Sequence, residues 1–463
     1  MKRIVFCGYR GTGKTEIGKI VAEKTGLRFL DTDALIEQQT GRSIPDIFHE
    51  DGEERFRREE RAVIGGLPQA DAVISTGGGV ITDPTNMVHL RKDSIMVLLY
   101  ADIDTIEARL TRKPRPPLTG LPLREEIATM MDRRRQHYMA AADYCIDTSE
   151  TTAEAAAAAV LTLIAKGNIT AQHRAPCIRF FRSGRIPPKC MERLMNVLAD
   201  NPADPLTRLM GVAGYPCAHS KGPRLFNALL EHYGLDYHYT WFEDPELDEI
   251  LRVARHLDVK GLSVTIPFKQ EIIPLIDEVE EHAAQQIGAV NTVVFACGTA
   301  VGYNTDWIGV RKPLTGLKGS KAVLLGAGGA AAGAAFALVD LDMDVTILNR
   351  TPAKAKAMAE RFGCKWGELS DFDTVKPDVV VNTTPLGMDT DNRSILRDDQ
   401  LHKGMTIFDL VYTPPVTPLI EAAQKAGCTT ITGTEMFIGQ AKEQFYLFFG
   451  IDVPAEKIRE LVP

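Results

Sequence analysis

The sequence has no Cys-x-x-Cys pair, although it contains 8 cysteines in 463 residues. Thiols scattered in this way through a long chain favour free cysteines in a reducing compartment over a disulfide framework or a zinc site. The sequence also has no excess of basic residues, since 53 Lys and Arg face 61 Asp and Glu, for a net charge of −8. This balance argues against nucleic acid or an anionic membrane as the main partner. We therefore expect a cytoplasmic protein with small-molecule ligands.

Long uncharged apolar runs are scarce. The opening run Ile4–Cys7 is too short for the core of a secretory signal. The uncharged stretch Val323–Val339 is slightly short of a membrane span, and its many Ala and Gly residues fit a buried strand, a tight turn and a helix better. Hydrophobic content of 44% and charged content of 25% are ordinary for a globular protein and exclude whole-chain disorder.

The length predicts two or three domains. Short apolar runs alternate with helical patterns, which predicts an α/β fold with parallel sheets. Residues 167–207 interrupt the alternation with five prolines and no clear periodicity, and we expect a linker there. The predicted domains are 1–166, then 208–318 together with 434–463, and 319–433. Nothing in the sequence indicates the oligomeric state.

A glycine-rich loop follows the first apolar run. Residues 8–15 form G-x-x-x-x-G-K-T between a predicted strand and a predicted helix. Glycines let backbone N–H groups turn toward phosphate oxygens, and the helix N-terminus adds positive potential. Lys14 can reach the β- and γ-phosphates, and the Thr15 hydroxyl can ligate Mg²⁺. The predicted ATP-binding residues of this loop are Gly11, Thr12, Gly13, Lys14 and Thr15.

Residues suited to a phosphoryl acceptor follow this loop in order. Asp31 and Asp33 come directly after an apolar run and could hold a metal-bound water and a sugar-like hydroxyl. Arginines can pair with an anionic acceptor or close over phosphates, and glycines let a ligand approach the backbone. The residues of these two kinds are Arg57, Gly77, Gly78, Gly79, Arg115 and Arg134. Each alone also fits a turn or a solvated face, but their order behind a phosphate loop favours function.

A second glycine-rich loop, Gly326-Ala327-Gly328-Gly329-Ala330, lies between a very apolar run and an Ala-rich helical pattern. This context predicts a dinucleotide-binding fold. The next predicted strand ends in Asn349-Arg350-Thr351, where NAD-preferring folds usually carry an acidic residue. The Arg350 guanidinium suits a 2′-phosphate instead, so the sequence favours NADPH and NADP⁺ over NADH, although an exposed arginine at a strand end is common.

The order of motifs in residues 1–165 resembles that of shikimate kinase. The resemblance implies a P-loop fold of the nucleoside-monophosphate-kinase type that uses ATP and Mg²⁺. Lys14 and Asp33 would act in catalysis, and Thr15 and Asp31 would serve the metal, Asp31 through water. Shikimate would be held by Asp33, Arg57, Gly77, Gly78, Gly79 and Arg134. Arg109 would lie near the adenine, and Arg115 would close over the phosphates.

Residues 208–463 resemble shikimate dehydrogenase. The motifs that carry this resemblance include Gly261-Leu-Ser263-Val-Thr265-Ile-Pro-Phe-Lys269, Gly288-Ala-Val-Asn291-Thr292 and Asn304-Thr305-Asp306. The resemblance implies a two-domain α/β enzyme with a Rossmann-type domain, in which Lys269 and Asp306 form the catalytic pair. It also implies that shikimate is held by Ser220, Gly222, Thr265, Lys269, Asn291, Asp306, Tyr412 and Gln440. The NADP site would comprise Gly326, Ala327, Gly328, Gly329, Ala330, Asn349, Arg350, Thr351, Leu410 and Gly433.

Two positions depart from the dehydrogenase pattern. Gly222 stands where the family usually has a second serine, and Trp307 follows Asp306 where glycine is usual. Trp307 either reshapes the wall beside the catalytic pair or packs in the core. Together the two resemblances predict a bifunctional enzyme of aromatic amino-acid precursor synthesis. Two alternatives stay open: one half is a non-catalytic nucleotide-binding module that regulates the other, or the dehydrogenase acts on quinate.

Overall fold

A computed structural model describes residues 3–113, 116–164, 208–218, 220–388 and 391–462. The chain divides into two compact units. The first comprises Met1–Leu262, Val294–Ala300 and Phe445–Val453, and the second comprises Ser263–Val293, Val301–Gln444 and Pro454–Pro463. The predicted linker 167–207 lies outside the described residues. Three sheets organise the described chain, and the α/β fold class expected from the sequence is confirmed.

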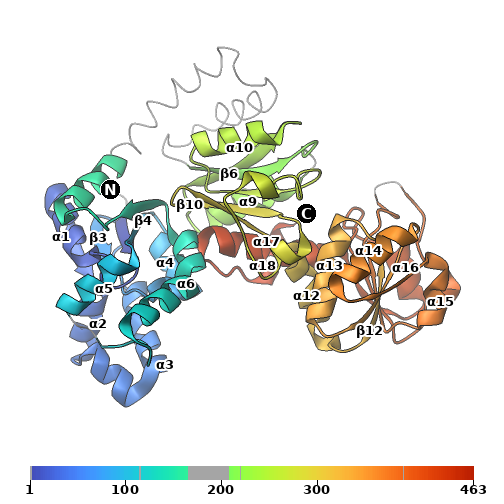
Figure 1. Cartoon of the computed structure of the whole chain (residues 1–463), viewed down its shortest axis with the longest axis horizontal. Helices are drawn as coiled ribbons and strands as arrows, with labels where there is room; N and C mark the ends of the chain where they lie inside the picture. Colours follow the sequence, from blue (N-terminus) through green and yellow to red (C-terminus); the bar gives the residue numbers. More distant parts are fainter. Residues whose placement is uncertain (1–2, 114–115, 165–207, 219, 389–390, 463) are drawn as a thin grey trace, which may run out of the picture. The chain divides into compact units, whose positions relative to one another are not determined.

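The first sheet has five parallel strands in the order β2-β3-β1-β4-β5, with helices on both of its faces (Figure 1). Its strands are β1 (Arg3–Cys7), β2 (Arg28–Asp31), β3 (Ala72–Ser75), β4 (Ser94–Tyr100) and β5 (Tyr144–Asp147). Its helices are α1 (Lys14–Thr25), α2 (Thr32–Thr40), α3 (Ile44–Gly65), α4 (Pro84–Arg91), α5 (Ile103–Arg112) and α6 (Leu123–Ala141). All five residues of β1 are buried, as expected for a central parallel strand covered on both faces. A further helix over residues 153–164 packs against this core.

The second sheet has six strands in the order β7-β6-β8-β10-β11-β9. They are β6 (Arg208–Gly214), β7 (Tyr237–Glu243), β8 (Gly261–Val264), β9 (Glu278–Val279), β10 (Thr292–Ala296) and β11 (Thr299–Tyr303). The helices of this region are α9 (Gly222–His232), α10 (Leu247–His256), α11 (Ala284–Ile287) and α12 (Asp306–Leu314). The most amphipathic of them, α10, buries Leu247, Ile250, Leu251, Val253 and Ala254.

The third sheet is parallel throughout, in the order β14-β13-β12-β15-β16-β17. This is the dinucleotide-binding order, in which the direction of winding reverses beside the first strand. The strands are β12 (Lys321–Leu325), β13 (Asp344–Leu348), β14 (Lys365–Gly367), β15 (Val379–Asn382), β16 (Thr406–Asp409) and β17 (Thr429–Ile431). The helices are α13 (Gly329–Asp340), α14 (Pro352–Phe362), α15 (Phe372–Val375), α16 (Pro418–Lys425), α17 (Gly433–Phe449) and α18 (Ala455–Leu461).

The structure corrects one expectation about the cysteines. Cys145 and Cys297 form a disulfide, with their Cα atoms 5.1 Å apart, so not all of the thiols are free. The pairing escaped sequence analysis because the two residues are 152 positions apart and only the folded chain brings them together. Cys7, Cys364 and Cys428 are free.

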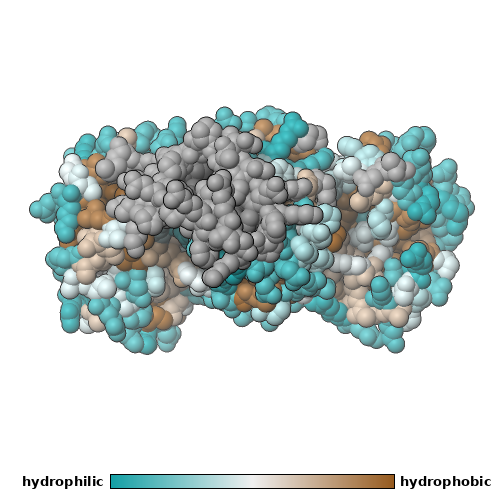
Figure 2. All heavy atoms as spheres, turned by 90° about the horizontal axis from the view of Figure 1, so that it is seen from above, coloured by the Kyte–Doolittle hydropathy of each residue, from teal (hydrophilic) through white to brown (hydrophobic). Residues whose placement is uncertain are grey.

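On the face drawn in Figure 2, hydrophobic residues are interspersed with hydrophilic ones outside the region covered by grey atoms. Among the helices in the described part of the chain, none is both long and apolar enough to cross a bilayer.

Candidate active sites

The phosphate loop joins β1 to α1 and folds back on itself. Gly8, Gly11 and Gly13 have φ values of 140°, 84° and 90°, a region that side-chain-bearing residues rarely adopt. The Lys14 ammonium donates to the carbonyls of Gly8 and Tyr9, both at 2.8 Å, and is nearly buried. Lys14 therefore lies along the loop, with its ammonium held by the loop's own carbonyls.

Two oxygen groups suited to Mg²⁺ meet at the end of this loop. The Thr15 hydroxyl donates to Asp31 Oδ2 at 2.8 Å, and Asp31 Oδ1 accepts the backbone N–H groups of Asp33 and Ala34. Hydroxyl and carboxylate oxygens are the ligands that Mg²⁺ prefers, with water and substrate phosphate completing its shell. Within the described residues no cluster of three or more metal-binding side chains occurs. The pair fits a metal held mainly by nucleotide and water.

The three glycines that follow β3 form the floor of a small polar site. A Cβ at Gly77 would lie 2.6 Å from Asp33 Oδ1, and a Cβ at Gly79 would lie 3.2 Å from both terminal nitrogens of Arg57. The guanidinium of Arg134, from α6, would lie 3.5 Å from a Cβ at Gly78 and 3.4 Å from a Cβ at Gly79. One carboxylate and two guanidinium groups thus border a backbone without side chains, which suits a ligand with both hydroxyl and carboxylate groups.

Partners to which the sequence analysis assigned no role hold this site in place. Arg57 donates to Glu60 Oε2 at 2.9 Å and to Glu53 Oε1 at 3.0 Å. Burial raises the pKa of the Glu60 carboxyl, against the opposing effect of Arg57. The hydroxyl of Tyr138, one turn after Arg134 on α6, donates to the Gly78 carbonyl at 2.8 Å. Glu60 reads as one acidic residue in a charged helix, so no sequence signal could have found it.

Arg109 lies against the phosphate loop and the end of the sheet. Its guanidinium donates to the Gly11 carbonyl at 3.1 Å and to the Thr148 carbonyl at 2.5 Å. The Thr148 hydroxyl lies 3.0 Å from the Tyr100 carbonyl and 3.3 Å from the Thr12 carbonyl. Arg115, predicted to close over the phosphates, lies outside the described residues.

Glu126, buried in the first turn of α6, joins the phosphate loop to the segment after residue 115. It accepts the backbone N–H groups of Leu118 and Thr119, each at 2.7 Å. It also pairs with Arg10 of the phosphate loop, whose guanidinium donates to the Pro116 carbonyl at 2.6 Å. Sequence analysis missed this connection because Arg10 occupies a variable position of the loop motif.

Lys269 and Asp306 form an ion pair in the second unit. The Lys269 ammonium donates to Asp306 Oδ2 at 2.6 Å. Asn291 Nδ2 donates to Asp306 Oδ1 at 2.8 Å, so both carboxylate oxygens are engaged. The Asn291 amide oxygen accepts the N–H of Thr305 at 2.7 Å, which fixes the amide orientation. Three motifs separated in the sequence thus converge on one carboxylate at the start of α12.

The other predicted substrate residues are divided between the units. Thr265 directly follows β8, and Tyr412 and Gln440 belong, like the Lys269–Asp306 pair, to the second unit. Ser220 and Gly222 belong to the first unit, where the Gly222 N–H donates to Ser220 Oγ at 3.2 Å. A Cβ at Gly222 would lie 3.3 Å from the Tyr239 hydroxyl.

The second glycine-rich loop lies at the carboxyl end of β12, where the sheet reverses its winding. Gly326 has φ of 110°, and a Cβ there would lie 2.5 Å from Thr383 Oγ1 at the end of β15. A Cβ at Gly328 or Gly329 would meet nothing within 4 Å, so the start of α13 has room for a pyrophosphate. Gly433 packs on the Leu410 carbonyl. Sequence analysis did not single out Thr383, which follows a buried strand.

The strand-end cluster predicted to select the cofactor follows β13. Asn349 Nδ2 donates to the Thr351 carbonyl at 3.0 Å, which shapes the turn into α14. Arg350 is exposed and makes no hydrogen bond or ion pair with any residue that the structure describes. An exposed guanidinium without a partner among the described residues is available to bind a 2′-phosphate.

Trp307 packs in the core rather than only lining a wall. Its ring lies edge-on to Phe336 of α13, with centroids 5.1 Å apart, and near His282 at 5.9 Å. On the same side, a Cβ at Gly333 would lie 3.7 Å from Asp306 Cβ. The nucleotide-binding helix therefore packs directly against the start of α12, where the ion pair lies.

Comparison with known proteins matches both parts of the chain. The family model for shikimate kinase matches residues 10–165. The model for the shikimate dehydrogenase substrate binding domain matches residues 212–293, that for shikimate / quinate 5-dehydrogenase matches 310–432, and that for the shikimate 5′-dehydrogenase C-terminal domain matches 433–462. A shikimate dehydrogenase (NADP⁺) of Pyrococcus abyssi is 38% identical over 259 residues, which cover 55% of this chain and 97% of that relative.

The chain belongs to the shikimate dehydrogenase family and carries an N-terminal shikimate kinase domain.

Solved structures of the dehydrogenase family match the same part of the chain. One, a shikimate dehydrogenase in complex with NADP⁺, is 36% identical, has a TM-score of 0.53, and matches over 56% of this chain and 96% of its own. Another, quinate dehydrogenase from Corynebacterium glutamicum in complex with NAD, is 32% identical with a TM-score of 0.52, over 55% of this chain and 98% of its own. The family thus includes neighbours named for either substrate and bound to either dinucleotide.

Proposed function

We propose that the chain catalyses two consecutive reactions. The dehydrogenase part reduces 3-dehydroshikimate to shikimate with NADPH, and the kinase domain phosphorylates shikimate to shikimate 3-phosphate with Mg-ATP. The observation that carries the proposal is that each part holds a complete set of chemical groups. The Lys269–Asp306 pair is fixed by Asn291 in one part, and Asp33 faces two arginines across the triple glycine in the other. A regulatory module would not need either set.

In the dehydrogenase part, NADPH supplies the hydride. Lys269 is the group that gives a proton to the carbonyl oxygen as it becomes a hydroxyl, because its ammonium is held at a defined position by Asp306. Asn291 orients Asp306 by occupying its second oxygen. Thr265, Tyr412 and Gln440 position the ring hydroxyls, and Ser220 binds the carboxylate.

In the kinase domain, Mg-ATP supplies the phosphoryl group. Arg57 and Arg134 bind the shikimate carboxylate in charge-assisted hydrogen bonds. Asp33 orients the attacking hydroxyl and accepts its proton. Lys14 exchanges its bonds to the loop carbonyls for bonds to the β- and γ-phosphates and stabilises charge that develops during transfer.

Two separate assays of the purified full chain test the proposal. We expect NADPH oxidation that depends on 3-dehydroshikimate, and ADP formation that depends on shikimate and Mg²⁺. ADP formation without dehydrogenase activity, or the reverse, in a folded protein would favour the alternative that one part only regulates the other.

A second substrate, quinate, is favoured by one observation. Gly222 lacks the hydroxyl that the family usually presents at this position, and the Tyr239 hydroxyl lies close to where that side chain would stand. Kinetics with shikimate and quinate, before and after Gly222→Ser, separate the candidates. A higher kcat/KM for shikimate than for quinate in the unmodified protein supports shikimate as the substrate. Gly222→Ser should then raise kcat/KM for both acids by about tenfold and leave their ratio unchanged, because both carry the carboxylate that one added hydrogen bond would reach. A higher kcat/KM for quinate in the unmodified protein would overturn shikimate as the proposed substrate.

We further propose a cytoplasmic location and small molecules as the ligands, with neither nucleic acid nor membrane as a partner. The net charge of −8 supports this, because cationic groups are needed only locally, where anionic substrates bind. We also propose the domain boundaries 1–166, 208–318 with 434–463, and 319–433, since the polar sites described above fall within these segments.

A further inference from the structure

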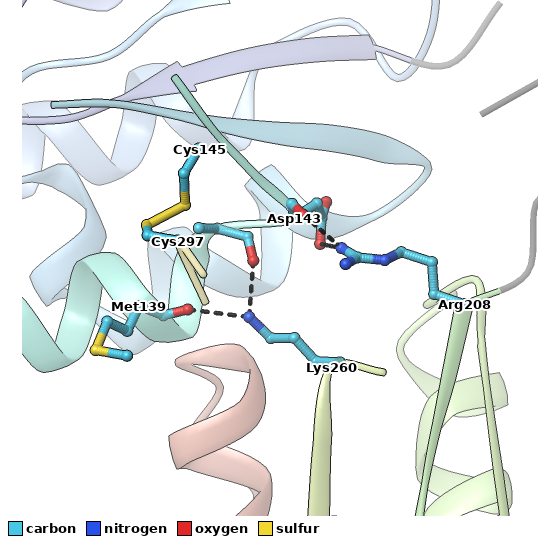
Figure 3. The surroundings of a disulfide bond; sticks show 7 residues. Met139, Asp143, Cys145, Arg208, Lys260 and Cys297 are labelled. Carbon is cyan, nitrogen blue, oxygen red and sulfur yellow. Dashed lines mark hydrogen bonds and ion pairs between the residues drawn. A yellow bond between two sulfur atoms is a disulfide. The ribbon is translucent and has the colours of Figure 1, made fainter. Parts of the chain in front are cut away.

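The disulfide joins the kinase domain to the dehydrogenase part of the chain. Cys145 lies in β5, the edge strand of the kinase sheet, and Cys297 lies in the turn between β10 and β11 (Figure 3). Their Cα separation of 5.1 Å is within the range that a disulfide requires. The bond therefore connects two segments that belong to different activities.

The disulfide is not the only connection at this place. The Lys260 ammonium, fully buried, donates to the carbonyls of Met139 at 2.9 Å and Ala142 at 2.7 Å at the end of α6 (Figure 3). Burial, and then Arg91, lower the pKa of Lys260 well below its usual value. Arg91 donates to the Ala140 carbonyl at 2.5 Å and to the Phe449 carbonyl at 2.9 Å. None of these contacts involves the two sulfur atoms, so we expect the two parts to stay in contact after reduction.

The disulfide is open to small reagents. Cys297 is exposed, and both sulfur-bearing residues line a cavity of about 410 Å³ together with Arg208 and Arg255. By contrast, the side chains of Cys7 and Cys217 are buried. Disulfides in reducing compartments are usually catalytic or redox-sensing rather than permanent, and accessible ones are the labile kind.

The strand that carries Cys145 continues into the ATP site. Three residues after Cys145, Thr148 binds the Arg109 guanidinium through its carbonyl, at 2.5 Å. Its hydroxyl lies between two carbonyls, that of Tyr100 at 3.0 Å and that of Thr12 in the phosphate loop at 3.3 Å. Within the described sheet β5 pairs with β4 alone, so a covalent anchor on this edge strand limits its movement. Loss of the disulfide would allow β5 to move, and with it Thr148, which contacts Arg109 and the phosphate loop.

We propose that Cys145–Cys297 is a reversible thiol–disulfide site that sets the affinity of the kinase domain for ATP. A thiolate of a dithiol reductant attacks the sulfur of Cys297, the more exposed residue of the pair, forms a mixed disulfide and releases the Cys145 thiolate. The second thiol of the reductant then releases Cys297. Two electrons and two protons pass to the cysteines, and the reductant becomes a disulfide. A small disulfide oxidant reverses the exchange. The nucleotide affinity invoked here rests on the proposed kinase function.

The test compares oxidised and reduced full-length protein. Peptide mapping without reduction identifies the cross-link, and a fluorescent ATP analogue reports the Kd of the nucleotide independently of turnover. After treatment with a dithiol we expect loss of the cross-link and a rise in Kd of about fivefold, the low end of coupling between sites. KM for NADPH should not change. Because binding is measured directly, failure of phosphoryl transfer is distinguishable from failure of this proposal.

Cysteine variants supply the controls. Cys145→Ser and Cys297→Ser should both show the Kd of the reduced protein under either condition. Cys428→Ser, which removes a partly exposed free thiol, should keep the full response to the dithiol. The proposal is overturned if oxidised protein contains no 145–297 cross-link, if reduction leaves the Kd unchanged, or if Cys428→Ser abolishes the response.

Discussion

We predict that the choice between NADPH and NADH depends on Arg350. Its guanidinium is exposed at the end of β13, and no acidic side chain stands between Asn349 and Thr351 to bind a free 2′-hydroxyl. We predict that kcat/KM for NADPH exceeds that for NADH by at least about tenfold, since one charged hydrogen bond contributes roughly 1.5–3 kcal/mol. Arg350→Ala should remove most of this preference through weaker NADPH binding.

A nearby cation provides the matched control. Lys354 is exposed on α14, four residues further along, and Lys354→Ala changes the net charge by the same amount. This variant should keep the preference for NADPH. Equal use of both cofactors by the unmodified protein, or a preference that survives Arg350→Ala, would show that the 2′-phosphate is recognised elsewhere.

At the residue scale, the sequence predicts best where a motif fixes local backbone geometry. Gly13, Lys14 and Thr15 could be assigned from spacing alone, because a strand, a loop and a helix follow one another in the chain. Lys269 and Asp306 could not, since they are 37 residues apart in numbering and their 2.6 Å contact is created by folding. Only resemblance to a family pointed to them, and their roles stay predictions.

Helix α6 connects the acceptor site to the phosphate loop. It carries Arg134 in its middle and Glu126 in its first turn, and Glu126 binds both Arg10 and the backbone of Leu118 and Thr119. Glu126→Gln removes the charge while keeping the volume. We expect KM for ATP to rise about tenfold, because hydrogen bonds to a charged group are weakened in the nucleotide-binding segment.

The adjacent Glu125 is exposed and lies in the same first turn of α6. Glu125→Gln therefore removes the same charge from the N-terminus of the helix but leaves the contact between Glu126 and Arg10 in place. Glu125→Gln should leave both kinase constants within about twofold of the unmodified protein, as surface substitutions usually do. A loss in Glu125→Gln equal to that in Glu126→Gln would mean that helix charge, not the contact with Arg10, matters.

Asp143, which directly precedes β5, makes the junction between the kinase domain and β6 sensitive to acid. Burial alone would raise the pKa of its carboxyl, but Arg91, Arg208 and Lys260 together hold that pKa below its usual value. A depressed pKa stabilises the folded state above the unfolded value of about 3.9, and this stability is lost as the pH falls through the folded value. We therefore expect Tm to fall below about pH 4 more steeply in the unmodified protein than in Asp143→Asn.

The exposed Asp258 also pairs with Arg208, from the solvent side. Asp258→Asn therefore serves as the control and should keep the acid dependence of Tm. Identical pH profiles for the unmodified protein and Asp143→Asn would contradict the assignment.

At the scale of elements, alternation of apolar runs and helical patterns predicted the parallel sheets. The runs Ile4–Cys7 and Ala72–Ser75 are central strands of the first sheet. Strand order was not predictable from the residues, because it depends on which crossover each helix makes. The Cys145–Cys297 pairing was not predictable either, since it depends on two sheets meeting at one turn.

At the scale of the whole chain, the product of the dehydrogenase part is the substrate of the kinase domain. Tethering raises an effective concentration only where two sites face each other. Because no observation places the two sites opposite each other, we expect shikimate to diffuse freely from the dehydrogenase site to the kinase site. An unlabelled pool of shikimate should then dilute the label in the product as strongly as it does in a mixture of single-activity variants. Greater retention of label in the unmodified chain would show transfer between the sites.

The central claim is that one chain holds two independent sites acting in sequence. The most direct measurement supplies 3-dehydroshikimate, NADPH and Mg-ATP and follows the products by chromatography. The unmodified protein should form shikimate 3-phosphate. Lys14→Met should stop at shikimate, because the cation facing the transferred phosphoryl group is lost, and Lys269→Ala should leave 3-dehydroshikimate unreduced. A mixture of the two variants should restore shikimate 3-phosphate. Failure of the folded variants to complement each other, or loss of both activities from either single change, would contradict the account.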